Sequence, residues 1–204
     1  MHNVPVLRRS VAGLAIGAML VLMTACGTKQ QPWALKNITG LMPDLSFQLT
    51  RDDGKPVTAA DYRGTVSLLY FGYTHCPDVC PLTLGRLAQA LHRMGADAQQ
   101  VRVLFVSVDP ARDTLQVLHQ YVKSFGPEFV GLRGPDTELR RFTKRYRVTY
   151  GRDKPDSKGN YQVSHSSAVF IFDKAGKIRL LSSGSDKASA IAEDLKRLVA
   201  EKAT

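Results

Sequence analysis

The chain has 204 residues, of which 44% are hydrophobic and 23% charged, and its formal net charge is +10 at pH 7. These proportions are typical of an ordinary globular protein and exclude a repetitive or low-complexity chain. The length suits one domain that follows a short leader.

Residues 1–25 have the three-part form of an export signal: a basic front, an apolar run of 13 residues (Val11–Met23) and small residues. The run is too short to cross a bilayer comfortably, which takes about 20 apolar residues. Leu22-Met23-Thr24-Ala25-Cys26 resembles a bacterial lipoprotein cleavage box, which implies cleavage before Cys26 and lipidation of its sulfur. An uncleaved anchor and a plain signal with an unmodified cysteine are the alternatives.

We expect residues 26–40 to form a tether and residues 41–204 to form the folded domain. The expected location is the bacterial cell envelope, on the periplasmic side, with the domain anchored to the membrane through lipid on Cys26. Exported domains meet an oxidising compartment, where disulfides can form and persist.

Within residues 41–204, apolar runs of strand length alternate with helical patterns. The expected strands are Leu45–Leu49, Val66–Phe71, Val101–Val108, Phe129–Leu132, Val148–Tyr150, Tyr161–Val163, Ala168–Phe172 and Lys177–Leu181. The expected helices are Pro81–Met94, one that starts after Asp113 or Thr114, a basic one that starts at Asp136 or Thr137, and one that carries Ile191 and Leu195. This order predicts an α/β domain in which helices cover both faces of a central sheet.

Cys76 and Cys80 lie where a buried strand gives way to a helix, and such folds place their sites at the carboxyl ends of strands. Proline is favoured at the first helical position, so we expect the helix to begin at Pro81. Both sulfurs would then face the positive end of the helix dipole, where thiolates are favoured. Thiolates bind metals or attack disulfides, and a lone pair this close in sequence is a weak structural staple. A metal or redox site is therefore favoured over a structural disulfide or two buried thiols.

Positive charge is concentrated in Arg133–Arg147. Without the two leader arginines, 26 basic residues face 18 acidic ones, a net charge of about +8. A basic face can bind an acidic protein, anionic lipid or nucleic acid, or simply be solvated. Export and the lack of aromatic residues interleaved with the basic ones argue against nucleic acid.

A third ligand for a metal would come from one of the five histidines. His75 adjoins Cys76, but the side chains of adjacent residues usually point apart. His165 stands alone just before the strand Ala168–Phe172 and could equally be structural. The pattern leaves both roles of His165 open.

Three blocks of sequence, in this order, closely resemble the SCO/SenC family. They are Tyr73-Thr74-His75-Cys76-Pro77-Asp78-Val79-Cys80-Pro81, then Val108-Asp109-Pro110 with Arg112-Asp113-Thr114, then Val163-Ser164-His165 ahead of Phe170-Ile171-Phe172-Asp173. That family comprises membrane-tethered, thioredoxin-like copper proteins that help to assemble the binuclear copper site of cytochrome c oxidase. The resemblance implies a three-layer thioredoxin-like fold with a central mixed sheet and helices on both faces.

The resemblance assigns the copper ligands to Cys76, Cys80 and His165, with a reversible disulfide between the two cysteines. Two thiolates and an imidazole suit Cu(I) and, with adjusted geometry, Cu(II), although zinc also accepts this set. The implied function is copper delivery, not enzymatic turnover. The implied partners are the copper-bearing subunit of cytochrome c oxidase and another periplasmic copper chaperone, with nucleic acid not expected.

The rival interpretation is a thiol–disulfide oxidoreductase that reduces the acceptor's cysteines before metal loading. Ordinary thioredoxins have two residues between their cysteines and a facing proline, whereas this chain has three residues and no proline near His165. A peroxidase and a structural zinc module are weaker alternatives, because no other domain cysteine could resolve a sulfenic acid and three ligands leave a zinc site open. Asp78 and Asp109 could tune the site or serve only in capping and loops.

Overall fold

The computed structural model describes residues 1–2, 31–157 and 161–202, and of His165 it describes the backbone only. The chain divides into two units, residues 1–31 and 32–204, and the second unit carries the fold. Residues 3–30, which include most of the leader, the cleavage box and Cys26, lie outside the described residues. Within the described part of the chain, we find no helix with the length and apolar character needed to span a bilayer.

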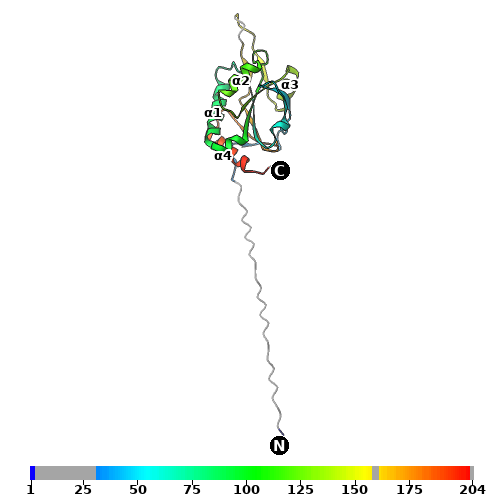
Figure 1. Ribbon diagram of the computed structural model, residues 1–204, viewed down its shortest axis with the longest axis vertical. Helices are drawn as coiled ribbons and strands as arrows, with labels where there is room; N and C mark the ends of the chain where they lie inside the picture. Colours follow the sequence, from blue (N-terminus) through cyan, green and yellow to red (C-terminus); the bar gives the residue numbers. More distant parts are fainter. Residues whose placement is uncertain (3–30, 158–160, 203–204) are drawn as a thin grey trace. The chain divides into compact units, whose positions relative to one another are not determined.

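An eight-stranded mixed sheet forms the centre of the domain (Figure 1), in the order β1-β10-β9-β4-β5-β6-β2-β3. Its strands are β1 (Lys36–Asn37), β2 (Gln48–Arg51), β3 (Pro56–Thr58), β4 (Val66–Gly72), β5 (Val101–Ser107), β6 (Phe129–Arg133), β9 (Val169–Phe172) and β10 (Ile178–Ser182). Neighbours β4, β5 and β6 are parallel, whereas β9 is antiparallel to β4. A separate hairpin pairs β7 (Tyr150–Arg152) with β8 (Val163–His165).

Helices cover both faces of this sheet, as predicted. They are α1 (Val79–Met94), α2 (Leu115–Lys123), α3 (Asp136–Arg145) and α4 (Ala188–Ala200), with short 3-10 turns at Ala59–Tyr62 and Gly95–Gln100. Successive side chains of a strand point to opposite faces, and β4 shows this in its aromatic contacts. The Tyr70 ring packs near Phe105, which in turn packs on Tyr121 of α2, whereas the Phe71 ring contacts Phe142 of α3. The strand β4 is buried along its whole length, as a central strand between two helical layers must be.

The parallel strands β4, β5 and β6 end on one edge of the sheet. Because parallel strands present their carboxyl ends together, the segments that follow Gly72, Ser107 and Arg133 start at that edge. Those segments are the thiol loop (Tyr73–Asp78), the loop that carries Asp109 and Arg112, and the start of α3.

Several boundaries differ from the sequence-based expectation: β2 covers Gln48–Arg51 instead of Leu45–Leu49, and larger consequences follow at α1 and at the expected tether. Helix α1 begins at Val79, so Pro81 is its third residue and Cys80 lies inside its first turn. The first four N–H groups of a helix have no partner within it, so proline is tolerated throughout the first turn and does not mark the start. Residues 32–40, expected in the tether, instead belong to the folded unit, where β1 pairs with β10 and Leu35 and Ile38 are buried.

The two strands of the hairpin also have different bounds from the expected arms Val148–Tyr150 and Tyr161–Val163. Each strand begins two residues later, at Tyr150 and at Val163. This shift makes His165 the last residue of β8, directly opposite Tyr150.

Candidate functional site

The two thiols of the domain lie in and next to the first turn of α1. Cys80 is completely buried, whereas Cys76 is partly exposed. The backbone N–H of Cys80 donates a hydrogen bond to Sγ of Cys76 over 3.4 Å. The first turn of the helix therefore holds the Cys76 sulfur beside that of Cys80, and the sequence-based pairing of the two thiols is consistent with this geometry.

Cys80 is enclosed by residues of the central strands. The hydroxyl of Tyr70 lies 3.6 Å from Sγ of Cys80 and donates to it. A Cβ atom added to Gly72 would lie 2.8 Å from Sγ of Cys80 and 2.6 Å from Cε2 of Phe105. Glycine is therefore required at the end of β4, because the buried sulfur occupies the space that a side chain would need.

The two thiols differ in acidity, which corrects the expectation that both favour the thiolate. Burial raises the pKa of the Cys80 thiol to about 12. Burial also raises the pKa of the Cys76 thiol, but hydrogen bonds from the backbone N–H groups of Cys80 and Asp78 outweigh it and hold that pKa below its ordinary value. In the metal-free protein, the Cys76 thiol therefore loses its proton more readily than the Cys80 thiol.

The thiol loop is held by the buried carboxylate of Asp113, one of the two residues after which the sequence analysis placed the start of a helix. Asp113 accepts hydrogen bonds from the N–H and the hydroxyl of Thr74, at 3.0 and 2.6 Å, and from the hydroxyl of Ser107 at 2.6 Å. Thr114 caps α2 instead, by accepting from the N–H of Val117. Asp113 therefore ties the thiol loop to the end of β5.

His75 does not join the two thiols. Its Nδ1 lies 3.1 Å from the hydroxyl of Thr74 and 3.6 Å from the carboxylate of Asp113. Among the described side chains, which exclude that of His165, no group of three His, Cys, Asp or Glu residues could hold a metal ion.

The hairpin that carries His165 is linked to the thiol loop. The hydroxyl of Tyr73 donates to Oε1 of Gln162 over 2.7 Å, although the two residues are 89 positions apart. Gln162 immediately precedes β8, whose last residue is His165. The side chain of His165 lies outside the described residues, so its role as a ligand stays a prediction.

The two aspartates that the sequence analysis left open have different surroundings. Asp78 is exposed at the N-cap of α1 and makes no side-chain capping bond. Asp109 is fully buried and contacts Arg112 and Tyr161. The sequence analysis gave Tyr70, Tyr73 and Gln162 no role of their own, because each makes its contact with a residue elsewhere in the sequence.

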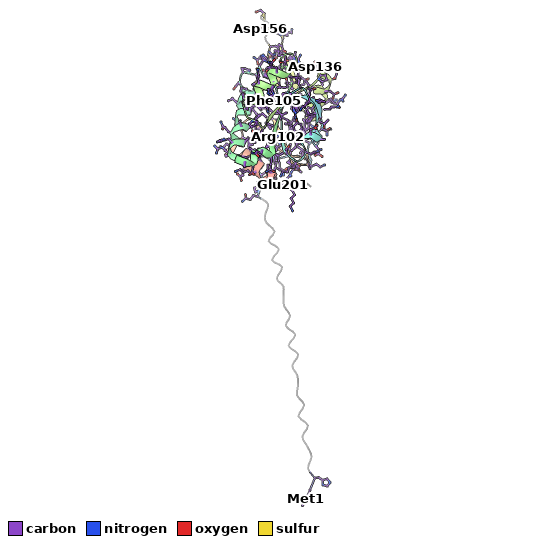
Figure 2. The ribbon with its side chains drawn as sticks, viewed as in Figure 1. Met1, Arg102, Phe105, Asp136, Asp156 and Glu201 are labelled. Carbon is purple, nitrogen blue, oxygen red and sulfur yellow. The ribbon has the colours of Figure 1, made fainter. Side chains whose placement is uncertain are left out.

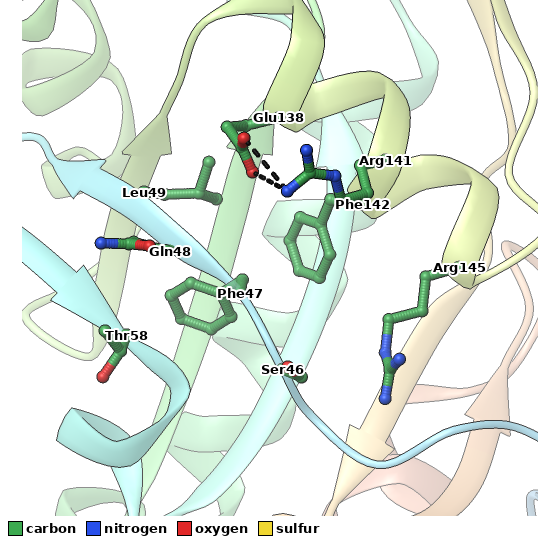
Figure 3. Close-up of a pocket in the computed structure, with 9 residues that line it drawn as sticks. All are labelled: Ser46, Phe47, Gln48, Leu49, Thr58, Glu138, Arg141, Phe142 and Arg145. Atoms are coloured by element: carbon green, nitrogen blue, oxygen red, sulfur yellow. Dashed lines mark hydrogen bonds and ion pairs between the residues drawn. The ribbon is translucent and has the colours of Figure 1, made fainter.

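The basic helix α3 borders a groove of about 420 Å³ that is separate from the thiol loop. Figure 3 shows the rings of Phe47 and Phe142 in this groove and the ion pair between Arg141 and Glu138 at its rim, at 3.3 Å. The exposed residues Arg140 and Lys144 add positive charge to the same helix. Whether this surface docks a partner stays a prediction.

Comparison with known proteins places these features in a family. The profile of the SCO1/SenC family matches residues 42–200. The mitochondrial SCO1 homolog 1 of Arabidopsis thaliana is 42% identical over 126 residues, which cover 61% of this chain and 37% of that protein. A SCO2-like protein of Rickettsia prowazekii is 32% identical over 167 residues, which cover 80% of this chain and 82% of that protein.

Solved structures agree with the fold. The structure of Bradyrhizobium japonicum ScoI with copper bound matches with a TM-score of 0.70 at 37% identity, over 76% of this chain and 98% of that chain. The predicted thioredoxin-like α/β fold, with a mixed sheet between helical layers, is confirmed by this likeness and by the topology.

Proposed function

Because the chain belongs to the SCO1/SenC family, we propose that it is a copper-binding metallochaperone that serves the binuclear copper site of cytochrome c oxidase. Copper is its cargo, held by Cys76, Cys80 and His165. The observation that carries the proposal is the pairing of two thiols at the start of α1 beside a hairpin that ends in a histidine. The related ScoI protein binds copper in its solved structure.

The donor set suits this cargo. Thiolate ligands select Cu(I), and an imidazole extends the set to Cu(II). Because Cys80 keeps its proton in the metal-free protein, copper binding should release that proton, and affinity should increase with pH. Cys76 is the more exposed of the two thiols, so we expect an acceptor to approach the cargo from its side.

Titration of the reduced protein with Cu(I) and Cu(II) tests this function. We expect one copper ion per chain and, with Cu(II), an absorption band from sulfur-to-copper charge transfer. Cys76→Ala, Cys80→Ala and His165→Ala should each remove most of the stoichiometric copper, whereas His92→Ala, on the exposed part of α1, should not. A Cys76→Ala protein that binds copper as tightly as the wild type would contradict the assignment.

A second candidate function, thiol–disulfide exchange, is favoured by the difference in acidity between the two thiols. The Cys76 thiolate would attack a disulfide of the acceptor protein, and the released acceptor thiolate would take up a proton. Cys80 would then lose its proton and attack the sulfur of Cys76, which releases the second acceptor thiol. The acceptor gains two electrons, and the chain is left with a Cys76–Cys80 disulfide.

The two functions differ in their need for His165. Disulfide reduction uses only the cysteines, so His165→Ala should reduce a disulfide-bonded acceptor peptide at the wild-type rate. The same variant should fail to deliver copper. Restoration of oxidase assembly by His165→Ala in a deletion strain would favour thiol reduction as the cellular role.

We further propose a location and partners for the protein. The cleavage box before Cys26 supports a lipid anchor on the periplasmic side of a bacterial membrane, with the copper-bearing subunit of cytochrome c oxidase as acceptor and another periplasmic copper chaperone as a further partner. Nucleic acid is not proposed as a partner. Blocking lipoprotein signal processing with globomycin should leave a larger, unprocessed form, and an unchanged mature size would contradict the anchor.

A further inference from the structure

A buried carboxylate outside the proposed ligand set holds the hairpin that ends in His165. Asp109 follows β5 and has no exposed surface. Its Oδ1 accepts a hydrogen bond from the hydroxyl of Tyr161 at 2.7 Å, on the chain that leads into β8. The same carboxylate lies 3.6 Å from Nη2 of Arg152, the last residue of β7. Asp109 therefore reaches both sides of the hairpin.

Arg112 contacts both Asp109 and Tyr161. Its Nε donates to Oδ2 of Asp109 at 2.5 Å, and its Nη1 donates to the backbone carbonyl of Tyr161 at 3.0 Å. The guanidinium also stacks on the Tyr161 ring, 3.6 Å from its centroid. Asp109, Arg112 and Tyr161 thus form a cycle of three mutual contacts, which we call the hairpin clamp.

The clamp adds polar attachments to a short hairpin, whose Val163 is buried in the core and whose Arg152 lies 3.9 Å from Asp136. Its two strands have three residues each, and an isolated two-stranded hairpin is marginally stable in water. Outside the clamp, the hydrogen bond from the hydroxyl of Tyr73 to Gln162 joins the hairpin to the thiol loop. Asp156 belongs to the segment that connects β7 to β8 along the chain, and Figure 2 shows it projecting from one end of the domain. Attachment at the clamp therefore contributes to the position of this segment, together with the packing of Val163 in the core.

We propose that Asp109 and Arg112 are positioning residues for His165: they hold Tyr161 at the carboxyl edge of the sheet and thereby fix the hairpin where its histidine can complete the thiol site. This inference rests on the proposed copper function. It adds residues that contact neither thiol but set the affinity for the cargo. Groups that orient a metal ligand typically change metal affinity 10- to 100-fold when they are altered.

A double-mutant cycle in the full-length, detergent-solubilised protein tests the proposal. Arg112→Lys keeps a positive charge near Asp109 but cannot make the planar contact with the Tyr161 ring and carbonyl together. Competition with a chromophoric Cu(I) chelator would measure affinity in the wild-type and His165→Ala backgrounds. We expect Arg112→Lys to lower affinity about tenfold in the first background and less than about twofold in the second, because the clamp acts through His165.

If Arg112→Lys does not fold, Tyr161→Phe tests the same contact, and amide hydrogen exchange measures the hairpin without copper. Tyr161→Phe removes only the hydroxyl bond to Asp109 and should lower affinity in the same direction. Amide hydrogen exchange of the metal-free protein should be faster over residues 150–157 and 161–165 in both variants, and unchanged in β4 and β5.

Arg179→Lys is the matched control. Arg179 is about as buried as Arg112, pairs with Asp173 and Glu201, and lies over the ring of Trp33. Its partner Glu201 lies at the end of the domain opposite Asp156 (Figure 2). We expect this variant to unfold more easily but to bind Cu(I) as tightly as the wild type.

The outcomes separate the positioning role from the copper function. An equal loss of affinity for Arg112→Lys in both backgrounds, or no loss in either, would overturn the positioning role. If His165→Ala loses affinity while the clamp variants keep it, only the positioning role fails. If His165→Ala binds copper as the wild type does, both the ligand assignment and the positioning role fail.

Discussion

The carboxylate of Asp113 accepts hydrogen bonds from both the N–H and the hydroxyl of Thr74, at 3.0 and 2.6 Å. This contact connects the thiol loop to the segment that precedes α2. Asp113 is completely buried. The carboxylate is therefore a structural part of the thiol loop, although it touches neither sulfur in the described contacts.

Loss of the Asp113 charge should loosen this connection. Asp113→Asn weakens three hydrogen bonds to a buried carboxylate, so we expect a loss of about 2 kcal/mol of unfolding free energy. Thermal unfolding should then occur about 4–8 °C lower. Asp97→Asn, at an exposed position, serves as the control and should change the midpoint by less than about 2 °C. Equal midpoints for the two variants would contradict this role of Asp113.

Gly72→Ala should damage the thiol site and stability together. The added methyl group would overlap Phe105 and the sulfur of Cys80, and overpacking of this kind costs about 1–3 kcal/mol. The control is Gly85→Ala on the same helix as Cys80, where a Cβ meets no atom within 4 Å. That change should stabilise α1 by up to about 1 kcal/mol. Thermal unfolding and Cu(I) titration of both variants would test this contrast.

Alkylation should distinguish the two thiols. The pKa of Cys76 lies below the ordinary thiol value and that of Cys80 is about 12, so Cys76 loses its proton first as pH increases. We expect iodoacetamide at pH 7.5 to modify Cys76 in the reduced protein while Cys80 remains unmodified. Peptide mapping across a pH series should show the rate at Cys76 levelling off at a lower pH than the rate at Cys80. Faster modification of Cys80 than of Cys76 would contradict the proposed acidity.

The basic helix should steer an acidic acceptor if it forms a docking surface. Reversal of Arg140 and Lys144 to Glu should slow association with the soluble copper-bearing domain of the oxidase subunit about fivefold at low salt. The difference should diminish at high ionic strength because salt screens exposed charges. Reversal of Arg93 and Lys196, exposed on α1 and α4, makes the same change in net charge. If both pairs of reversals slow association equally, net charge and not this surface is responsible.

Local pattern along the chain was sufficient to predict the class of fold and the place of the thiols. Period-two and helical periodicities are properties of neighbouring residues, and they identified β4, β5 and α1 with small errors at their ends. The start of α1 was placed two residues late because proline is compatible with any position in the first turn. The place of Cys76 and Cys80, between the end of β4 and the start of α1, followed from the change of pattern at Gly72 and Pro81.

Only the tertiary structure decided the state of the thiols and the contacts that hold the site. The expected start of the helix placed both sulfurs where thiolates are favoured, but acidity also depends on burial, and Cys80 is enclosed by residues that are distant in sequence. In the same way, Thr74 and Asp113 are 39 positions apart and Tyr73 and Gln162 are 89 apart. Hydrophobic periodicity carries no information about such pairs, because they meet only after the sheet has brought separate loops to one edge.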